Sequence, residues 1–187
     1  MADAVDLSVP LGHQERADWL KSIIRDIPDF PTLGILFRDI TPLLKDVRAF
    51  RVALEGLAEP FKDAGIEQVI GVESRGFIFG APLALLLHAG FVPVRKFGKL
   101  PAETIHVEYA LEYGSNTVEI HTDGIQRGQK VLVVDDLLAT GGTVGAALDL
   151  VQRLGGDVVG IAFLVELTAL QGRQRLAGQN IFSLIQY

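Results

Sequence analysis

The sequence contains no cysteine, which excludes disulfide bonds, thiolate zinc sites and a cysteine nucleophile. It also lacks an excess of basic residues, because 17 Lys and Arg stand against 23 Asp and Glu. The longest apolar run, Gly80–Leu87, is far shorter than the ~20 residues that a membrane-spanning helix needs. We therefore expect neither a nucleic acid nor a membrane among the partners of this chain. What remains, 187 residues of which 49% are hydrophobic, is typical of one globular domain.

The first twelve residues are small or polar and follow no periodic pattern. They have neither the basic start nor the apolar run of a secretory signal. We expect a flexible N-terminal extension over residues 1–12, a single domain over residues 13–187, and a soluble, cytoplasmic protein.

Strand-like and helix-like segments alternate along the rest of the chain with short connections. Short apolar runs typical of buried strands lie at 68–73, 91–97, 130–134, 157–165 and 182–186. Helical spacing of apolar residues, or an apolar helical run, appears at 14–25, 46–65, 77–88, 143–154 and 168–177, with Asp46 as a plausible N-cap and Pro60 as a bend. This alternation predicts an α/β fold with a mainly parallel twisted sheet flanked by helices.

One segment, between residues 98 and 116, has the period-two pattern of a β-hairpin. Ile105 and Tyr109 share one parity and His106 takes the other. We expect an exposed hairpin that closes near Gly114.

Residues 131–143 (VLVVDDLLATGGT) combine an apolar strand, two carboxylates, a turn of small residues and the start of a helix. Small side chains let backbone N–H groups converge on a phosphate, and the threonine hydroxyls and the positive end of the helix add to this attraction. Carboxylates at the end of a strand are good acceptors for the hydroxyls of a ribose. The segment could also be only a strand end followed by a capped helix, but this full combination is rare by chance. We predict a ribose 5-phosphate site formed by Asp135, Asp136, Ala139, Thr140, Gly141, Gly142 and Thr143.

This segment is similar to the phosphoribosyl-pyrophosphate-binding motif of the type I phosphoribosyltransferases. The similarity extends from about residue 27 to the C-terminus, and further segments resemble those members of the family that act on adenine. These segments are FPTLGILFRDI (30–40), ESRGFIFG (73–80), RKFGKLP (95–101) and LEYG (111–114).

The resemblance implies a type I phosphoribosyltransferase fold with a mobile hairpin hood, and a role in purine salvage. The reaction would transfer the 5-phosphoribosyl group from phosphoribosyl pyrophosphate to N9 of adenine, giving AMP and pyrophosphate. It would require Mg²⁺, and the protein would be a homodimer. Mg²⁺ prefers oxygen ligands and binds through phosphates. We therefore expect the substrate to carry it near Asp135 and Asp136, with few direct ligands from the protein.

Site residues follow from the same resemblance. Glu112 would be the catalytic acid/base, acting on the proton at N7 of the purine, and the loop 73–76 would contain a cis peptide bond. The ring of Phe37 would stack on adenine while the backbone of Leu36 and Arg38 reads its edge. Pyrophosphate would be bound by Ser74, Arg75, Arg95, Lys96 and Lys99.

Two other functions stay open. Some regulators keep this fold and sense phosphoribosyl pyrophosphate without catalysis, but they would need a DNA-binding extension or a basic face. A phosphoribosyltransferase for another purine is the second alternative. In the enzymes for 6-oxopurines an aspartate stands at the position of Ala139, and its absence weighs against that reading.

Overall fold

The computed structural model describes residues 12–110 and 115–187. Its contacts divide the chain into two compact units, residues 1–56 and residues 57–187. The single domain expected over residues 13–187 stays a prediction. None of the helices in the described part of the chain combines the length and the apolar character that crossing a membrane requires.

The N-terminal unit consists of short elements. These are α1 (His13–Ile23), β1 (Arg25–Ile27), β2 (Phe37–Asp39), α2 (Thr41–Lys45) and most of α3 (Val47–Ala58). Strands β1 and β2 pair in antiparallel fashion. They were not predicted, because three partly exposed residues per strand carry no readable alternation. Asp46 caps α3 as expected, since its Oδ1 accepts hydrogen bonds from the backbone N–H groups of Arg48 and Ala49.

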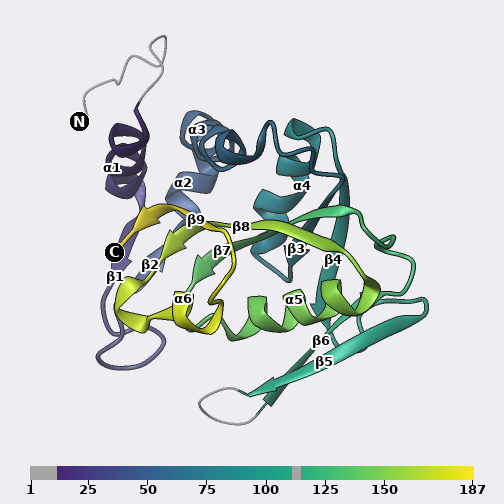
Figure 1. The fold of residues 1–187 in the computed structure, drawn as a ribbon. Coiled ribbons are helices and arrows are strands. Elements are labelled where there is room, and N and C mark those ends of the chain that lie inside the picture. Colours follow the sequence, from purple (N-terminus) through teal and green to yellow (C-terminus); the bar gives the residue numbers. More distant parts are fainter. Residues whose placement is uncertain (1–11, 111–114) are drawn as a thin grey trace. The chain divides into compact units, whose positions relative to one another are not determined.

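The C-terminal unit is built on one seven-stranded sheet with the strand order β5-β6-β4-β3-β7-β8-β9 (Figure 1). Its strands are β3 (Gln68–Val72), β4 (Gly90–Lys96), β5 (Thr104–Ala110), β6 (Ser115–His121), β7 (Lys130–Leu138), β8 (Asp157–Glu166) and β9 (Ile181–Gln186). Its helical segments are η1 (Glu59–Phe61), α4 (Gly76–Leu86), α5 (Gly142–Leu154), η2 (Thr168–Leu170) and α6 (Gly172–Arg175). Five neighbouring strands are parallel and the β5–β6 hairpin is antiparallel, so the predicted α/β fold is confirmed.

The two main crossovers leave the centre of the sheet in opposite directions. Strands β3 and β7 are neighbours, and α4 leads from β3 to β4 while α5 leads from β7 to β8. Helices α4 and α5 therefore cover opposite faces of the sheet (Figure 1). In such sheets ligands bind where the crossovers diverge, beyond the carboxyl ends of the two central strands.

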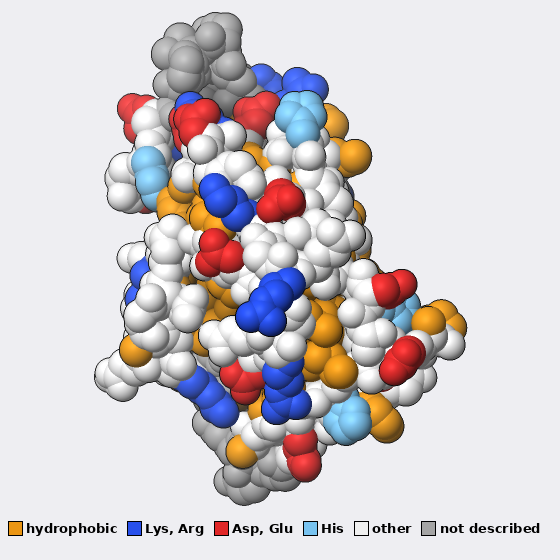
Figure 2. All heavy atoms as spheres, turned by 45° about the vertical axis from the view of Figure 1, so that its right-hand side comes forward, with side chains coloured by type: hydrophobic (Ala, Val, Ile, Leu, Met, Phe, Trp, Pro, Cys, Tyr) orange, Lys and Arg blue, Asp and Glu red, His pale blue; other side chains and the backbone are white. Residues whose placement is uncertain are grey.

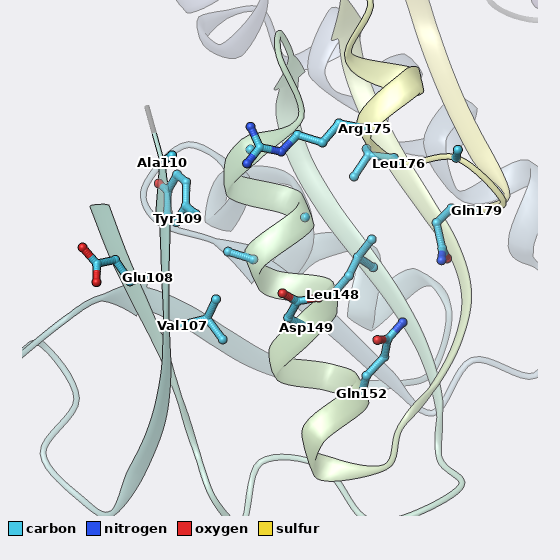
Figure 3. A pocket seen from close by; sticks show the side chains of 14 residues that line it. Val107, Glu108, Tyr109, Ala110, Leu148, Asp149, Gln152, Arg175, Leu176 and Gln179 are labelled. Atoms are coloured by element: carbon cyan, nitrogen blue, oxygen red, sulfur yellow. The ribbon is translucent and has the colours of Figure 1, made fainter. Parts of the chain in front are cut away.

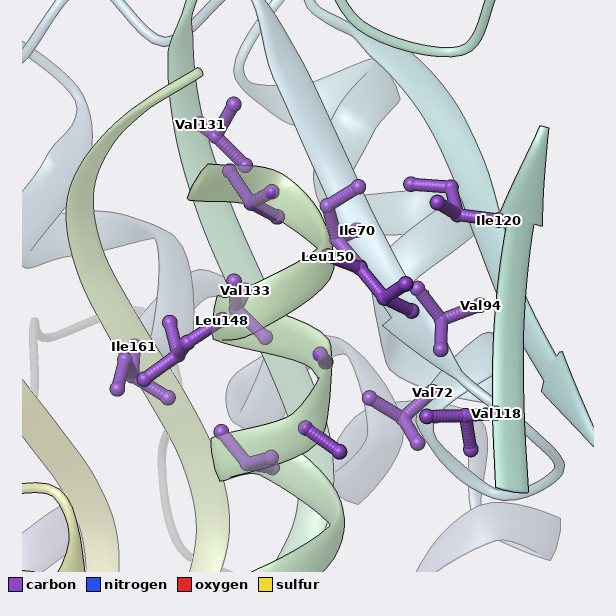
Figure 4. Close-up of a cluster of buried hydrophobic side chains, with 14 of the residues drawn as sticks. Ile70, Val72, Val94, Val118, Ile120, Val131, Val133, Leu148, Leu150 and Ile161 are labelled. Atoms are coloured by element: carbon purple, nitrogen blue, oxygen red, sulfur yellow. The ribbon is translucent and has the colours of Figure 1, made fainter. Parts of the chain in front are cut away.

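The main core lies between α5 and the sheet. Branched apolar side chains of the central strands pack against the inner face of α5 (Figure 4). Ile70, Val133 and Leu150 are completely buried there. Because this packing is dense on all sides, it holds the beginning of α5 at a defined place beside the end of β7.

The β5–β6 hairpin matches its predicted alternation but is less exposed than expected. His106 and Glu108 face solvent, whereas Val107 is buried against the core on which α5 packs. The residues that would close the hairpin, including Gly114, lie outside the described part of the chain.

Three predicted boundaries were wrong. The helix expected over 46–65 ends at Ala58 and is followed by the short segment η1. Strand β7 continues to Leu138 rather than ending at Val134, because β8 is long enough to pair with it as far as Glu166. The helix expected over 168–177 consists of two short segments, η2 and α6, which are separated by Gln171 in a left-handed conformation.

Candidate functional site

A cavity of about 380 Å³ opens where the crossovers of β3 and β7 diverge. The ladder between these strands ends at the pair Gly71–Val134, whereas β7 continues along β8. The last residues of β7 are therefore left without β3 beside them, and this leaves room for a ligand. The cavity is lined by Glu73, Ser74, Arg75, Lys96, Asp135, Asp136, Leu137, Ala139 and Thr143.

The cavity brings together residues that were predicted for two parts of one substrate. Ser74, Arg75 and Lys96 come from the set expected to bind pyrophosphate. Asp135, Asp136, Ala139 and Thr143 come from the set expected to bind ribose 5-phosphate. The other members of this second set, Thr140, Gly141 and Gly142, complete the turn into α5.

An ion pair links the two sides of the cavity. Nε of Arg75 lies 2.8 Å from Oδ2 of Asp136, whose side chain is only 7% exposed. Burial raises the pKa of Asp136, although the nearby charge of Arg75 opposes this effect. Arg75 therefore reaches from the loop after β3 to the last residues of β7.

Asp135 is in a different environment from its neighbour. Its Oδ1 accepts a hydrogen bond of 2.9 Å from the backbone N–H of Asp136. Burial raises the pKa of Asp135 well above its usual value, and the negative charge of Asp136 raises it further. Because the two carboxylates share one site, they take up protons as a pair, and the ion pair with Arg75 stabilises the charge on Asp136.

The loop between β3 and α4 passes very close to this pair. The peptide bond between Glu73 and Ser74 is cis, as the resemblance predicted. A Cβ atom on Gly76 would lie 2.9 Å from Oδ1 of Asp135 and 2.9 Å from the carbonyl oxygen of Val134. Only glycine lets α4 begin this close to the end of β7.

Glu73 binds the two basic residues that end β4. Its carboxylate accepts hydrogen bonds from Nε of Arg95 at 3.2 Å and from the backbone N–H of Lys96 at 2.9 Å. Burial acts to raise the pKa of Glu73, but these bonds outweigh it and the pKa lies below its usual value. Arg95 also donates to the carbonyl oxygen of Lys99. Neither Arg95 nor Lys99 lines the cavity, so their predicted contact with pyrophosphate stays a prediction.

Glu119 on β6 was not predicted to contribute to the site. It is 2% exposed, and its Oε1 accepts hydrogen bonds from the backbone N–H groups of Lys99 and Leu100 at 2.8 and 2.9 Å. Its Oε2 accepts a further one from Thr104. It thereby holds the chain that follows Lys96. No signal in the sequence distinguishes it from Glu108, which is exposed on the same hairpin.

The turn into α5 is shaped by glycine and carries no charged side chain. Gly141 has φ of +79°, and a Cβ there would lie 2.8 Å from the carbonyl oxygen of Gly172. Gly141 and Gly142 are buried, whereas Thr140 is exposed. Helix α5 begins at Gly142, so the first N–H groups of the helix lie in this turn, where they can donate to an anion.

The residues expected to bind adenine lie in the N-terminal unit. The ring of Phe37 on β2 meets the ring of Phe30 edge to face, with 5.2 Å between centroids. Arg38 forms an ion pair with Asp26 on β1, and Leu36 is 45% exposed. The paired strands thus hold the backbone of this segment in place. Glu112, the predicted acid/base, lies outside the described residues.

The described residues contain no group of three His, Cys, Asp or Glu side chains that could hold a metal ion. At the cavity the carboxylates are Asp135, Asp136 and Glu73, and two of them already bind arginines. This donor set fits an oxygen-preferring cation that keeps most of its ligands from water and substrate.

Comparison with known proteins agrees with this geometry. Residues 44–181 match the family model described as phosphoribosyl transferase domain. The adenine phosphoribosyltransferase of Halothermothrix orenii is 58% identical over 167 residues, which cover 89% of this chain and 98% of that protein. That of Solibacter usitatus is 57% identical over 168 residues, covering 90% and 97%.

Solved structures show the same relationship. The crystal structure of adenine phosphoribosyltransferase from Thermoanaerobacter pseudethanolicus has a TM-score of 0.89 and 54% identity, covering 91% of this chain and 99% of that chain. The enzyme from Saccharomyces cerevisiae, complexed with adenine and an imino-altritol bisphosphate, has a TM-score of 0.86 and 40% identity, with coverage of 91% and 99%. The chain belongs to the phosphoribosyltransferase family, within its adenine phosphoribosyltransferase branch.

Proposed function

We propose that this protein transfers the 5-phosphoribosyl group of phosphoribosyl pyrophosphate to N9 of adenine, releasing AMP and pyrophosphate, in purine salvage. The observation that carries the proposal is the cavity in which Arg75 and Lys96 meet the acid pair and the first turn of α5. The relatives named above support the choice of base.

The assignment of substrate groups follows the charges around the cavity. The 5-phosphate binds the turn at residues 139–143, where backbone N–H groups and hydroxyls are the donors. The ribose hydroxyls bind the acid pair, with Asp136 accepting hydrogen bonds and Asp135, when protonated, also able to donate one. Pyrophosphate binds at Ser74, Arg75 and Lys96, because charge develops on this group as it leaves.

In the reaction, the lone pair on N9 of adenine attacks C1 of the ribose while the bond from C1 to the pyrophosphate oxygen breaks. Pyrophosphate leaves with the bonding electrons, and the proton at N7 of the purine passes to Glu112. The basic side chains stabilise the leaving group, and the acid pair holds the sugar so that C1 faces the incoming nitrogen. Mg²⁺ bound with the pyrophosphate would neutralise further charge on it, with Asp135 or Asp136 holding the ion through water.

Adenine binds the segment at β2 in this proposal. Phe37 stacks on the purine, and the backbone of Leu36 and Arg38 reads the donor and acceptor groups on its edge. A 6-oxopurine presents the reverse pattern, and a site whose polar groups it leaves unpaired rejects it strongly.

A homodimer is part of the proposal. Helix α4 is apolar along its whole length, and Ile78, Leu85 and Leu86 are 37%, 78% and 49% exposed. Phe97, which follows β4, is 59% exposed. A second copy of the chain would cover these side chains. Sedimentation equilibrium at micromolar concentration should give twice the chain mass, and a monomer would contradict this part of the proposal.

The location of the reaction in the cell is proposed from the charge of the substrate. A substrate that carries several phosphate groups does not cross a bilayer unaided, and we place the reaction in the cytoplasm.

On the face shown in Figure 2, acidic and basic side chains are interspersed rather than gathered into one basic surface. This favours an enzyme over a regulator that binds nucleic acid.

The substrate test compares three bases. The purified protein is incubated with phosphoribosyl pyrophosphate, Mg²⁺ and adenine, hypoxanthine or guanine, and nucleotide formation is measured. We expect AMP from adenine and at most traces of product from the other two bases. Comparable rates with hypoxanthine or guanine would support a phosphoribosyltransferase for another purine. Binding of phosphoribosyl pyrophosphate without product from any base would support the sensing regulator.

The acid/base role is tested by Glu112→Gln. If Glu112 moves the N7 proton, turnover should fall by roughly 10²-fold or more while both substrates still bind. Glu108→Gln is the matched control on the same hairpin and should retain turnover. Near-normal turnover of Glu112→Gln would remove this residue from the reaction.

A further inference from the structure

A tyrosine on the hairpin reaches the turn that is proposed to bind phosphate. The hydroxyl oxygen of Tyr109, on β5, lies 3.1 Å from Oγ1 of Thr143 in the first turn of α5, and either group could be the donor. Tyr109 is partly buried. Strand β5 is thus joined to the phosphate turn by a hydrogen bond between two side chains.

The ring of Tyr109 lies beside the first residues of α5. A Cβ atom on Gly142 would lie 3.5 Å from Cδ2 of Tyr109 and 3.3 Å from Nη1 of Arg175 on α6. Both side chains approach the start of α5, from the hairpin on one side and from α6 on the other (Figure 3). The ring of Tyr109 therefore lies beside Gly142, at a place from which its hydroxyl meets Thr143.

The direction of the hydrogen bond depends on what Thr143 binds. A hydroxyl group has one hydrogen to donate and two lone pairs to accept with, whereas the oxygens of an ionised phosphate accept only. When Thr143 donates to a phosphate, its lone pairs are free and the hydroxyl of Tyr109 must be the donor to it. Such a chain polarises the central hydroxyl and strengthens the bond that it donates.

We propose that Tyr109 is a positioning residue for the 5-phosphate: its hydroxyl donates to Thr143 and thereby fixes and polarises the Thr143 hydroxyl that donates to the phosphate. This inference rests on the proposed function, because it requires the phosphate to bind at the turn of residues 139–143. It assigns no contact between Tyr109 and the substrate itself.

The first test is Tyr109→Phe, which removes only the hydroxyl. The KM for phosphoribosyl pyrophosphate and the Kd for ribose 5-phosphate, measured by calorimetry, should each rise about fivefold, the effect of one neutral hydrogen bond. The KM for adenine and the kcat at saturation should change by less than about twofold. Tyr187→Phe makes the same chemical change outside the proposed binding site and should leave all these values unchanged. A matching rise in the KM for adenine would show a general structural effect and overturn the proposal.

The second test asks whether Tyr109 acts through Thr143. Thr143→Val should weaken ribose 5-phosphate binding at least tenfold, since it removes the hydroxyl that donates to a charged group, whereas Thr143→Ser should bind nearly as well as the unaltered protein. In the Thr143→Val background, Tyr109→Phe should cause no further loss. A full additional fivefold loss would mean that Tyr109 acts independently, and would overturn the inference.

The two tests separate failure of the inference from failure of the proposed function. If Thr143→Val leaves ribose 5-phosphate binding unchanged, the Thr143 hydroxyl does not bind the phosphate and the role of Tyr109 is overturned, whereas the proposed function fails only if no AMP forms from adenine. If Thr143→Val weakens binding and Tyr109→Phe does not, the phosphate site stands and only the role of Tyr109 is overturned.

Discussion

The two loops at the centre of the sheet occupy equivalent positions but differ in chemistry. The loop between β3 and α4 contains the charged side chains of Glu73 and Arg75. The turn between β7 and α5 consists of small residues and carries no charge, so that backbone N–H groups and hydroxyls are its donors. Charged side chains can find partners within the protein, as Arg75 does with Asp136, whereas the N–H groups of a first helical turn have no partner in the helix.

Under the proposed function, this difference would separate two tasks at one site. A charged side chain that already has a partner in the protein can interact with that partner and with an anion at the same time. Such a side chain suits the pyrophosphate group, which binds with the substrate and is released after the reaction. Unpaired backbone donors on a rigid helix suit a group that stays attached to the sugar throughout. The loops are also joined, because Arg75 binds Asp136 and Gly76 lies against Asp135. A substitution in the loop between β3 and α4 should therefore also alter the position of the acid pair at the end of β7.

The largest effect is expected from Arg75→Ala. It removes a cation from the cavity and leaves the buried carboxylate of Asp136 without its partner, so the KM for phosphoribosyl pyrophosphate should rise roughly 10- to 100-fold. The KM for adenine should change much less, since Arg75 is assigned to pyrophosphate and not to the base. Steady-state kinetics with each substrate varied in turn measures both values. Arg51→Ala, at an exposed position of α3, is the control. Equal changes in both KM values would contradict the assignment of Arg75 to pyrophosphate.

A smaller effect is expected from Gly141→Ala in the uncharged turn. Its positive φ alone costs an L-residue about 1–2 kcal/mol. The new Cβ would in addition press against the carbonyl oxygen of Gly172. Gly128→Ala is the matched control, because φ there is +82° and nothing lies within 4 Å of the added atom. Urea unfolding should show a larger loss for Gly141→Ala, and only this variant should raise the KM for phosphoribosyl pyrophosphate. If Gly141→Ala and Gly128→Ala lower the free energy of unfolding equally, α6 moves to make room for the added Cβ atom and the contact with Gly172 costs nothing.

The smallest effect is a gain in stability from Asp135→Asn. The pKa of Asp135 is raised in the folded protein, so its contribution to stability is present below its unfolded pKa of ~3.9 and is lost as the pH rises through the folded value. An asparagine keeps the acceptor for the N–H of Asp136 and carries no charge. Tm should therefore rise by about 2–4 °C at pH 7, which corresponds to about 1 kcal/mol in a chain of this size, and the gain should vanish near pH 4. The exposed Asp149→Asn is the control, and a pH-independent gain would show that charge is not the cause.

Much of the fold could be predicted because its signals are local. Strand β3 and helix α5 were expected within one residue of their observed bounds, since apolar runs and periodic spacing mark them directly. The extension of β7 past Val134 could not be predicted, because it depends on pairing with β8 along its whole length. The strands β1 and β2 were missed for a similar reason. Each has only three residues and is a strand because it pairs with the other.

The sequence motifs predicted which residues lie at the candidate site, but they did not predict which side chains there bind one another. Ser74, Arg75, Lys96 and the acid pair line one cavity, as expected for residues that bind parts of one substrate. Arg95 was expected at the same ligand, but its guanidinium binds Glu73. The buried carboxylate of Glu119 and the hydroxyl of Tyr109 carry no sequence signal, because their roles depend on residues 15 to 34 positions away along the chain.

The amino-acid sequence alone determined the succession of strands and helices, the small residues of the turn before α5 and the kinds of side chain available for a phosphorylated sugar. These properties are encoded within short stretches, where periodicity and residue size act over a few positions. Only the tertiary structure decided which carboxylate pairs with Arg75, which arginine reaches the cavity and which hydroxyl lies beside Thr143. These depend on burial and on contacts between strands distant in sequence, which arise when the sheet assembles.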